Sequence, residues 1–91
     1  MKFILTHEVG RLAKWLRILG FDTAYQKKDD KKELVLRSLR EERIVVSRNA
    51  SLAKYTGIRF IHIKSDLLEG QLKQLKDEIE LPINEEDMFT Q

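Results

Sequence analysis

Two polar segments of this 91-residue chain hold the residue types and spacing that could do chemistry. The apolar run at residues 3–5 leads into Thr6, and the apolar run at residues 44–46 leads into a segment that ends at Asn49. Short apolar runs of this kind predict buried strands. Ligands and metals bind at the carboxyl ends of parallel strands in α/β proteins. A metal-dependent nuclease would place carboxylates there, whereas Thr6 and Asn49 are neutral.

Carboxylates do occur close to the predicted strand ends, at Glu8, Asp29, Asp30 and Asp66. Phosphodiester hydrolysis with Mg²⁺ or Mn²⁺ requires several such groups to converge on the cation. Each acid also has a structural explanation, because aspartates cap helix N-termini and an acid in the first helical turn is favoured by the helix dipole. Spacing alone leaves both explanations open, so no residue is assigned as a metal ligand.

Charge is distributed unevenly along the sequence. Residues 1–64 carry 15 Lys and Arg against 7 Asp and Glu, while residues 65–91 carry 2 against 8. A basic body favours an anionic partner such as RNA, although a solvated Lys/Glu-rich surface would give the same composition. The candidate nucleic-acid contacts, expected on or near the edge formed by the strand ends, are Arg11, Lys14, Arg17 and Arg48.

Several classes of protein are excluded or disfavoured by composition. The chain has no cysteine, which excludes disulfides and cysteine-ligated metal sites. No apolar run approaches the roughly 20 residues of a membrane span. The N-terminal residues do not have the pattern of a signal peptide, so we expect a soluble cytoplasmic protein without a membrane partner. Phosphate-loop and dinucleotide-loop patterns are absent. Composition does not predict the oligomeric state.

Hydrophobic periodicity predicts a strict alternation of strands and helices. Strands are expected at 3–5, 21–25, 44–46 and 58–63, and helices at 9–19, 30–42, 51–56 and from about 65 to 79. This order is typical of a three-layer α/β fold with a mostly parallel sheet of about four strands. The domain is expected to span residues 1–82, followed by an acidic C-terminal tail at 83–91.

The second predicted helix has an N-terminal capping signal and an apolar stripe. Asp29 or Asp30 is expected to cap it, since Asp30 precedes Glu33 by three residues as in a capping box. The residues that we expect this helix to bury are Val35, Leu39, Leu34 and Leu36.

The sequence resembles the Mut-seven C-terminal RNase domain family, which is PIN-like and regarded as metal-dependent. The resemblance begins with the segments at 2–6, 10–17 and 19–23 and continues to about residue 80. Its most specific part is the run Gly-Arg-Leu-Ala-Lys-Trp-Leu-Arg followed by Gly-Phe-Asp-Thr. Family members usually continue into a cysteine-rich zinc ribbon, and this sequence has no cysteine.

The resemblance implies a PIN-like fold, a nuclease site at the strand ends and Mg²⁺ or Mn²⁺ as the metal. The family pattern has aspartates at the positions of Thr6 and Asn49, and its third acid matches Asp30. We therefore expect a ribonuclease-related domain that is weakened or inactive. Glu8 lies two residues after Thr6 and could form a relocated acidic pair with Asp30. The alternatives are an RNA-binding or a protein-interacting pseudo-nuclease.

Overall fold

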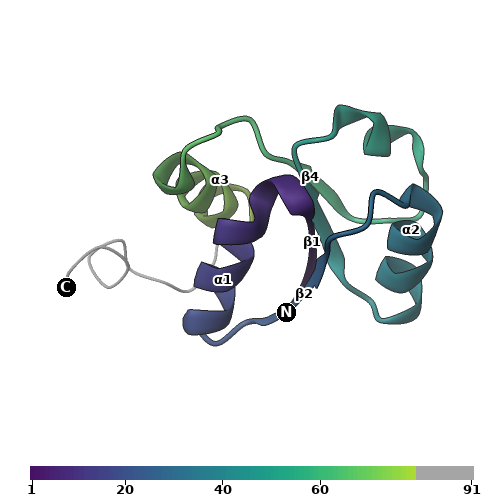
Figure 1. The fold of residues 1–91 in the computed structure, drawn as a ribbon, viewed down its shortest axis with the longest axis horizontal. Coiled ribbons are helices and arrows are strands. Elements are labelled where there is room, and N and C mark those ends of the chain that lie inside the picture. The colour runs from purple at the N-terminus through teal and green to yellow at the C-terminus, as the bar shows by residue number, and fades with distance from the viewer. Residues whose placement is uncertain (80–91) are drawn as a thin grey trace.

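The computed structural model describes residues 1–79, which form one α/β domain around a four-stranded sheet (Figure 1). All strand pairs are parallel and their order is β2-β1-β3-β4. The strands are β1 (Lys2–Thr6), β2 (Asp22–Gln26), β3 (Ile44–Ser47) and β4 (Phe60–His62). The α-helices are α1 (Gly10–Ile18), α2 (Lys31–Arg40) and α3 (Leu68–Ile79), and two 3₁₀ helices are η1 (His7–Val9) and η2 (Ala50–Lys54).

Helices cover both faces of the sheet, which confirms the predicted three-layer arrangement (Figure 1). On one face, α1 and α3 pack against the strands through a cluster that includes Phe3 and Leu72. On the other face, α2 and η2 enclose a smaller cluster that includes Ile4 and Leu34. Successive strand residues point to opposite faces, so neighbours such as Phe3 and Ile4 enter different clusters. The architecture is compatible with a PIN-like α/β fold.

The buried face of α2 differs from the predicted stripe. Leu34 is buried, Val35 is half-buried, and Leu36 and Leu39 are 61% and 48% exposed, so the expectation that these last two are buried was wrong. The second buried position is instead Ser38, four residues after Leu34. Its hydroxyl donates to the Val35 carbonyl oxygen at 2.7 Å, and this bond lets a polar side chain face the sheet.

The helix ends follow the local signals in the sequence. Asp30 caps α2, with its Oδ1 accepting from the Glu33 backbone N–H at 3.1 Å. Gly20 follows α1 with φ of 93°, a conformation that glycine adopts without steric cost. The predicted helix at 51–56 is the 3₁₀ helix η2 instead.

The structure does not describe the C-terminal segment that was predicted to be a tail. The predicted acidic tail at 83–91, and the domain boundary before it, lie outside the described residues. Among residues 1–79, no helix has both the length and the apolar character that crossing a membrane requires.

Candidate strand-end site

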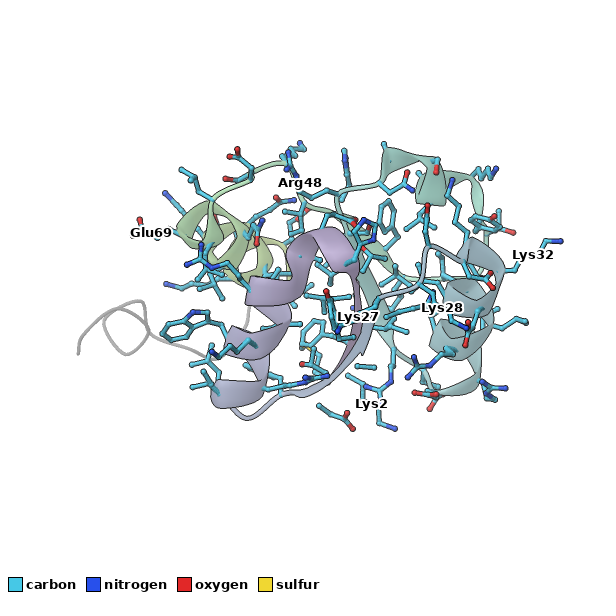
Figure 2. The ribbon with its side chains drawn as sticks, in the orientation of Figure 1. Lys2, Lys27, Lys28, Lys32, Arg48 and Glu69 are labelled. Carbon is cyan, nitrogen blue, oxygen red and sulfur yellow. The ribbon has the colours of Figure 1, made fainter. Side chains whose placement is uncertain are left out.

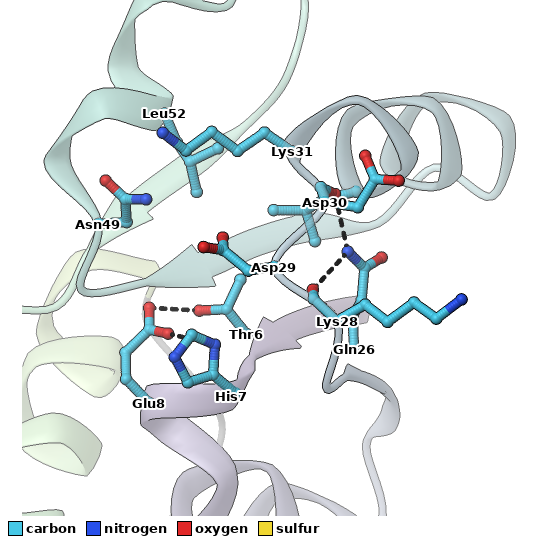
Figure 3. A pocket seen from close by; sticks show the side chains of 11 residues that line it. Thr6, His7, Glu8, Gln26, Lys28, Asp29, Asp30, Lys31, Asn49 and Leu52 are labelled. Atoms are coloured by element: carbon cyan, nitrogen blue, oxygen red, sulfur yellow. Dashed lines mark hydrogen bonds and ion pairs between the residues drawn. The ribbon is translucent and has the colours of Figure 1, made fainter.

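The carboxyl ends of the central strands bring the two polar segments together. Because β1 pairs with β3, residues that follow Leu5 lie beside residues that follow Val46. They border a water-sized cavity of about 20 Å³, which we name the strand-end hollow (Figure 3). Its lining residues are Thr6, His7, Glu8, Gln26, Lys28, Asp29, Asp30, Lys31, Leu34, Asn49 and Leu52. All four predicted catalytic positions are among them.

The Glu8 carboxylate bridges the ends of β1 and β3. Its Oε1 accepts hydrogen bonds from Thr6 Oγ1 at 2.5 Å, Ser47 Oγ at 2.6 Å and the Arg48 backbone N–H at 3.0 Å. Burial raises the pKa of this carboxyl, but the bonds from Ser47, Thr6 and the backbone outweigh burial and leave the pKa below its ordinary value. Glu8 is therefore a carboxylate with one oxygen fully engaged by protein donors.

The second oxygen of Glu8 faces the neighbouring histidine. His7 Nδ1 lies 3.3 Å from Glu8 Oε2, and the His7 side chain is 56% exposed (Figure 3). The backbone carbonyl of His7 accepts from Tyr25 Oη at 3.3 Å. The histidine is thus anchored through its main chain while its ring lies open to solvent.

Asn49 uses its side chain to organise the turn after β3. Its Oδ1 accepts from the backbone N–H of Ser51 at 3.1 Å and from Ser51 Oγ at 2.7 Å, which caps η2. Its own backbone N–H donates to Ser47 Oγ at 3.0 Å. The Asn49 amide oxygen is therefore occupied by local hydrogen bonds.

The two aspartates before α2 point in different directions. The Asp30 carboxylate turns away from the strand ends, where it caps the helix, while the Asp29 carboxylate projects toward Thr6 and Glu8 (Figure 3). The capping signal in the sequence predicts this direction for Asp30, because a side chain that caps its own helix is held at the helix end. Asp29, and not Asp30, is thus the acid that faces Glu8.

Gln26 is a part of the site to which the sequence had assigned no role. It is buried, pairs in register with Thr6, and donates through Nε2 to the carbonyl oxygens of Lys28 and Asp30 at 3.1 and 2.8 Å. Its Oε1 is buried and, among the described residues, has no hydrogen-bond partner. Gln26 therefore fixes the loop that carries Asp29. Its position at the end of β2 was the feature of the sequence that could have indicated a role for Gln26 in the site.

The four basic candidates do not share one edge. Arg48 lies at the carboxyl end of the sheet, opposite the end marked by Lys2 (Figure 2), and Arg11 lies on the first turn of α1. Because α1 runs back along the sheet from there, Lys14 and Arg17 are progressively farther from the strand ends. Arg17 Nε donates to the Thr23 carbonyl of β2 at 2.9 Å. The expected common edge is therefore wrong for Arg17, and the binding roles stay predictions.

The residues of the hollow do not fit the Mg²⁺ or Mn²⁺ that the family resemblance implies. Thr6 and Asn49 are neutral, Asn49 Oδ1 accepts two hydrogen bonds, and Glu8 Oε1 accepts three. Within residues 1–79 there is no group of three or more His, Cys, Asp or Glu side chains placed to hold a metal ion. Mg²⁺ requires near-octahedral oxygen ligands and sheds its waters reluctantly, so these few oxygens form a poor cage.

Comparison with known proteins identifies the family of the chain. No curated protein and no solved structure is significantly similar to the chain. The family model described as "Mut7-C RNAse domain" matches residues 1–91, the whole chain. The resemblance given by the sequence motifs is therefore confirmed, and the chain belongs to the Mut7-C RNAse domain family.

Proposed function

We propose that this chain is a ribonuclease-related domain in which metal-dependent cleavage is weakened or lost and RNA binding is retained. The observation that carries the proposal is the engagement of Glu8 Oε1 by Thr6, Ser47 and the Arg48 backbone N–H. Oε1 would have to give up these three bonds to coordinate a cation, which leaves Oε2 as the oxygen through which Glu8 could reach one.

The remaining acids do not compensate for the missing charges. Asp30 Oδ1 is used as a helix cap, so the relocated pair of Glu8 with Asp30 would cost α2 its cap. Asp29 faces the hollow toward Glu8, while the Asp30 carboxylate, although it lines the hollow, is turned toward the helix end that it caps (Figure 3). Two carboxylates with one oxygen already engaged give weak affinity for Mg²⁺.

RNA binding is supported by the charge of residues 1–64 and by two arginines near the strand ends. Arg11 and Arg48 are exposed, and Lys31 extends across the hollow toward Asn49 (Figure 3). Cations arranged around a strand end can track a phosphate backbone without reading base sequence.

The test is to measure binding and cleavage of single-stranded RNA by the full chain. Binding is expected to weaken with salt, and the Arg11→Ala/Arg48→Ala variant is expected to lower the salt slope by about 1.4 for two lost phosphate contacts. Arg59→Ala, at the opposite edge of the sheet, is the control and should leave the slope unchanged.

Cleavage is expected to be no faster in Mg²⁺ or Mn²⁺ than in EDTA. A metal-dependent rate that falls in both Glu8→Ala and Asp30→Ala would instead establish the relocated acidic pair and contradict the proposal. Absence of RNA binding at low salt would contradict the proposed RNA binding and would favour a role in protein interaction.

A further inference from the structure

A groove beside the strand-end hollow has the size and lining of a nucleotide site. It follows the start of α1, has a volume of about 440 Å³, and is lined by residues that include His7, Arg11 and Tyr25. We name it the α1 groove. Its volume lies in the range of roughly 300–1,000 Å³ that is typical of small-ligand sites. An aromatic ring and a guanidinium on one surface suit a base and a phosphate.

Two contacts shape this groove. A Cβ atom at Gly10 would lie 3.0 Å from Tyr25 Oη, so glycine there lets the tyrosine ring pack against the first turn of α1. On the opposite side, the buried Gln71 side chain donates through Nε2 to the Ser65 carbonyl oxygen at 3.0 Å. The amide oxygen of Gln71 is the part of that side chain left to accept from a ligand.

His7 and Glu8 line both the hollow and the groove. Glu8 is fixed on the hollow side through Oε1, which leaves Oε2 facing the imidazole, 3.3 Å from His7 Nδ1. A carboxylate on one ring nitrogen selects the tautomer and directs the lone pair of the other nitrogen outward. With this contact tightened to a hydrogen bond, the pair would have the arrangement of a general base with its orienting group, and such bonds are often long before substrate binds.

We propose that His7 and Glu8 form a metal-independent base dyad that cleaves single-stranded RNA bound in the α1 groove. The proposal rests on the RNA binding proposed above and adds a reaction to it. His7 is the catalytic residue because its Nε2 touches the reacting proton. Glu8 is a positioning residue because it acts through the imidazole.

The proposed step is attack by a ribose 2′-hydroxyl on the adjoining phosphate. His7 Nε2 takes the 2′-hydroxyl proton, the 2′-oxygen forms a bond to phosphorus, and the bond from phosphorus to the 5′-oxygen breaks. The leaving 5′-oxygen takes a proton from water, and the resulting hydroxide recovers the proton held by the imidazolium. The products are a 2′,3′-cyclic phosphate and a 5′-hydroxyl. Arg11 would stabilise the charge that develops on the phosphate.

The experiment compares two substrates in EDTA with the full chain. Ordinary RNA is expected to yield fragments ending in 2′,3′-cyclic phosphate, identified by mass spectrometry. The same sequence with 2′-O-methyl riboses is expected to bind, measured by fluorescence anisotropy, and to remain intact because its nucleophile is blocked. Water attack on phosphorus would cleave both substrates and would overturn the proposal.

Three variants separate the roles of the dyad. His7→Gln is expected to lower the rate by about 100-fold or more and to change RNA affinity far less than the rate, since positioned bases contribute about 10²–10⁴-fold. Glu8→Gln keeps an oxygen for Ser47 but presents an amide to His7, so it is expected to lower kcat more than it changes KM. Nitrogen NMR of the His7 ring should report the tautomer change, which a purely structural role would not produce. Arg59→Ala is the control.

The outcomes also separate this inference from the RNA binding on which it rests. Binding without cleavage, or cleavage that His7→Gln leaves unchanged, would overturn the dyad alone. Failure of the wild-type chain to bind either substrate would overturn the proposed RNA binding and the dyad together. His7→Gln is informative even if Glu8→Gln unfolds, because the His7 ring is largely exposed.

Discussion

Glu8 Oε1 and Ser47 Oγ lie 2.6 Å apart although the two residues are 39 positions apart in the chain. This hydrogen bond joins the segment after β1 to the end of β3, the two central strands of the sheet. Thr6 and the Arg48 backbone N–H complete the contact. A carboxylate thus lies at the strand ends with one oxygen held by three protein donors.

Removing one of these donors should destabilise the domain. Thr6→Val keeps the side-chain shape but leaves Glu8 Oε1 short of one hydrogen bond in a partly buried setting. A hydrogen bond to a charged group contributes about 1.5–3 kcal/mol, so we expect a loss of that size in urea unfolding. Thr56→Val, on an exposed turn, is the control and should change stability by less than about 0.5 kcal/mol. An equal effect of both substitutions would show that the hydroxyl of Thr6 does not support Glu8.

Acid should weaken the domain partly through Glu8. The pKa of Glu8 lies below its ordinary value of 4.5 in the folded state, so its stabilisation is present above pH 4.5 and is lost as pH falls through the lowered pKa. Hydrogen bonds from Arg43 lower the pKa of Asp22 and Glu41 as well, so wild type loses stability from several groups in acid. The difference between wild type and Glu8→Gln in the free energy of unfolding, measured against pH, isolates the contribution of Glu8.

Glu8→Gln should therefore unfold with a weaker dependence on pH below 4.5 than wild type. Glu69→Gln, at an exposed glutamate, is the matched control for the loss of one carboxylate from the chain. Parallel curves for wild type and Glu8→Gln would rule out a lowered pKa at Glu8.

The strands and the cap of α2 were predictable because their signals are local. Apolar runs marked β1 and β3, and the spacing of Asp30 and Glu33 marked the cap. The strand order is not local, so the sequence did not reveal that Glu8 would meet Ser47 across neighbouring strands. The stripe of α2 was misjudged for a related reason.

The rotation of a helix on its sheet depends on what the sheet presents. The face of the sheet beneath α2 presents the small side chain of Ala24 beside Ile4 and Val45. The helix turns Leu34 and Ser38 toward this face and leaves Leu36 exposed. The spacing of apolar residues cannot predict that a serine is buried on the helix face when its hydroxyl bonds to a carbonyl of its own helix.

Gly70→Ala should destabilise α3 despite the higher helix propensity of alanine. A Cβ at this position would lie 2.7 Å from Ser65 Cβ, too close for the backbone to keep its place. Alanine gains up to about 1 kcal/mol in propensity, but overpacking costs about 1–3 kcal/mol, so we expect a net loss of about 1 kcal/mol. Thermal unfolding of the purified variant measures it.

A double-mutant cycle gives the control for Gly70→Ala. Ser65→Gly removes the obstructing side chain, so the pair of substitutions should be more stable than the sum of the single effects predicts. Additive effects would show that the serine is not the obstacle.

Arg43 should be the main polar support at the amino ends of the strands, opposite the strand-end hollow. Its side chain, 13% exposed, donates to Glu41 Oε1 at 2.6 Å, Asp22 Oδ1 at 2.9 Å and the Phe3 carbonyl oxygen at 3.1 Å. Arg43→Ala leaves that carbonyl without this donor, so we expect a loss of about 1.5–3 kcal/mol in urea unfolding. Arg40→Ala, at the exposed end of α2, should stay within about 0.5 kcal/mol. A similar loss in both would assign the effect to charge alone.

The strand-end hollow is expected not to bind a divalent cation, and titration of the ¹⁵N-labelled chain with Mg²⁺ and then Mn²⁺ tests this directly. We expect no saturable shift with millimolar Mg²⁺ and no selective Mn²⁺ broadening at the amides of Glu8, Asp29 and Ser47. Thr6→Asp/Asn49→Asp places carboxylates at the two positions where the family resemblance implies them and is the positive control, expected to show both effects. Saturable shifts in the wild-type chain at Glu8 and Asp29 would show instead that the hollow holds a cation.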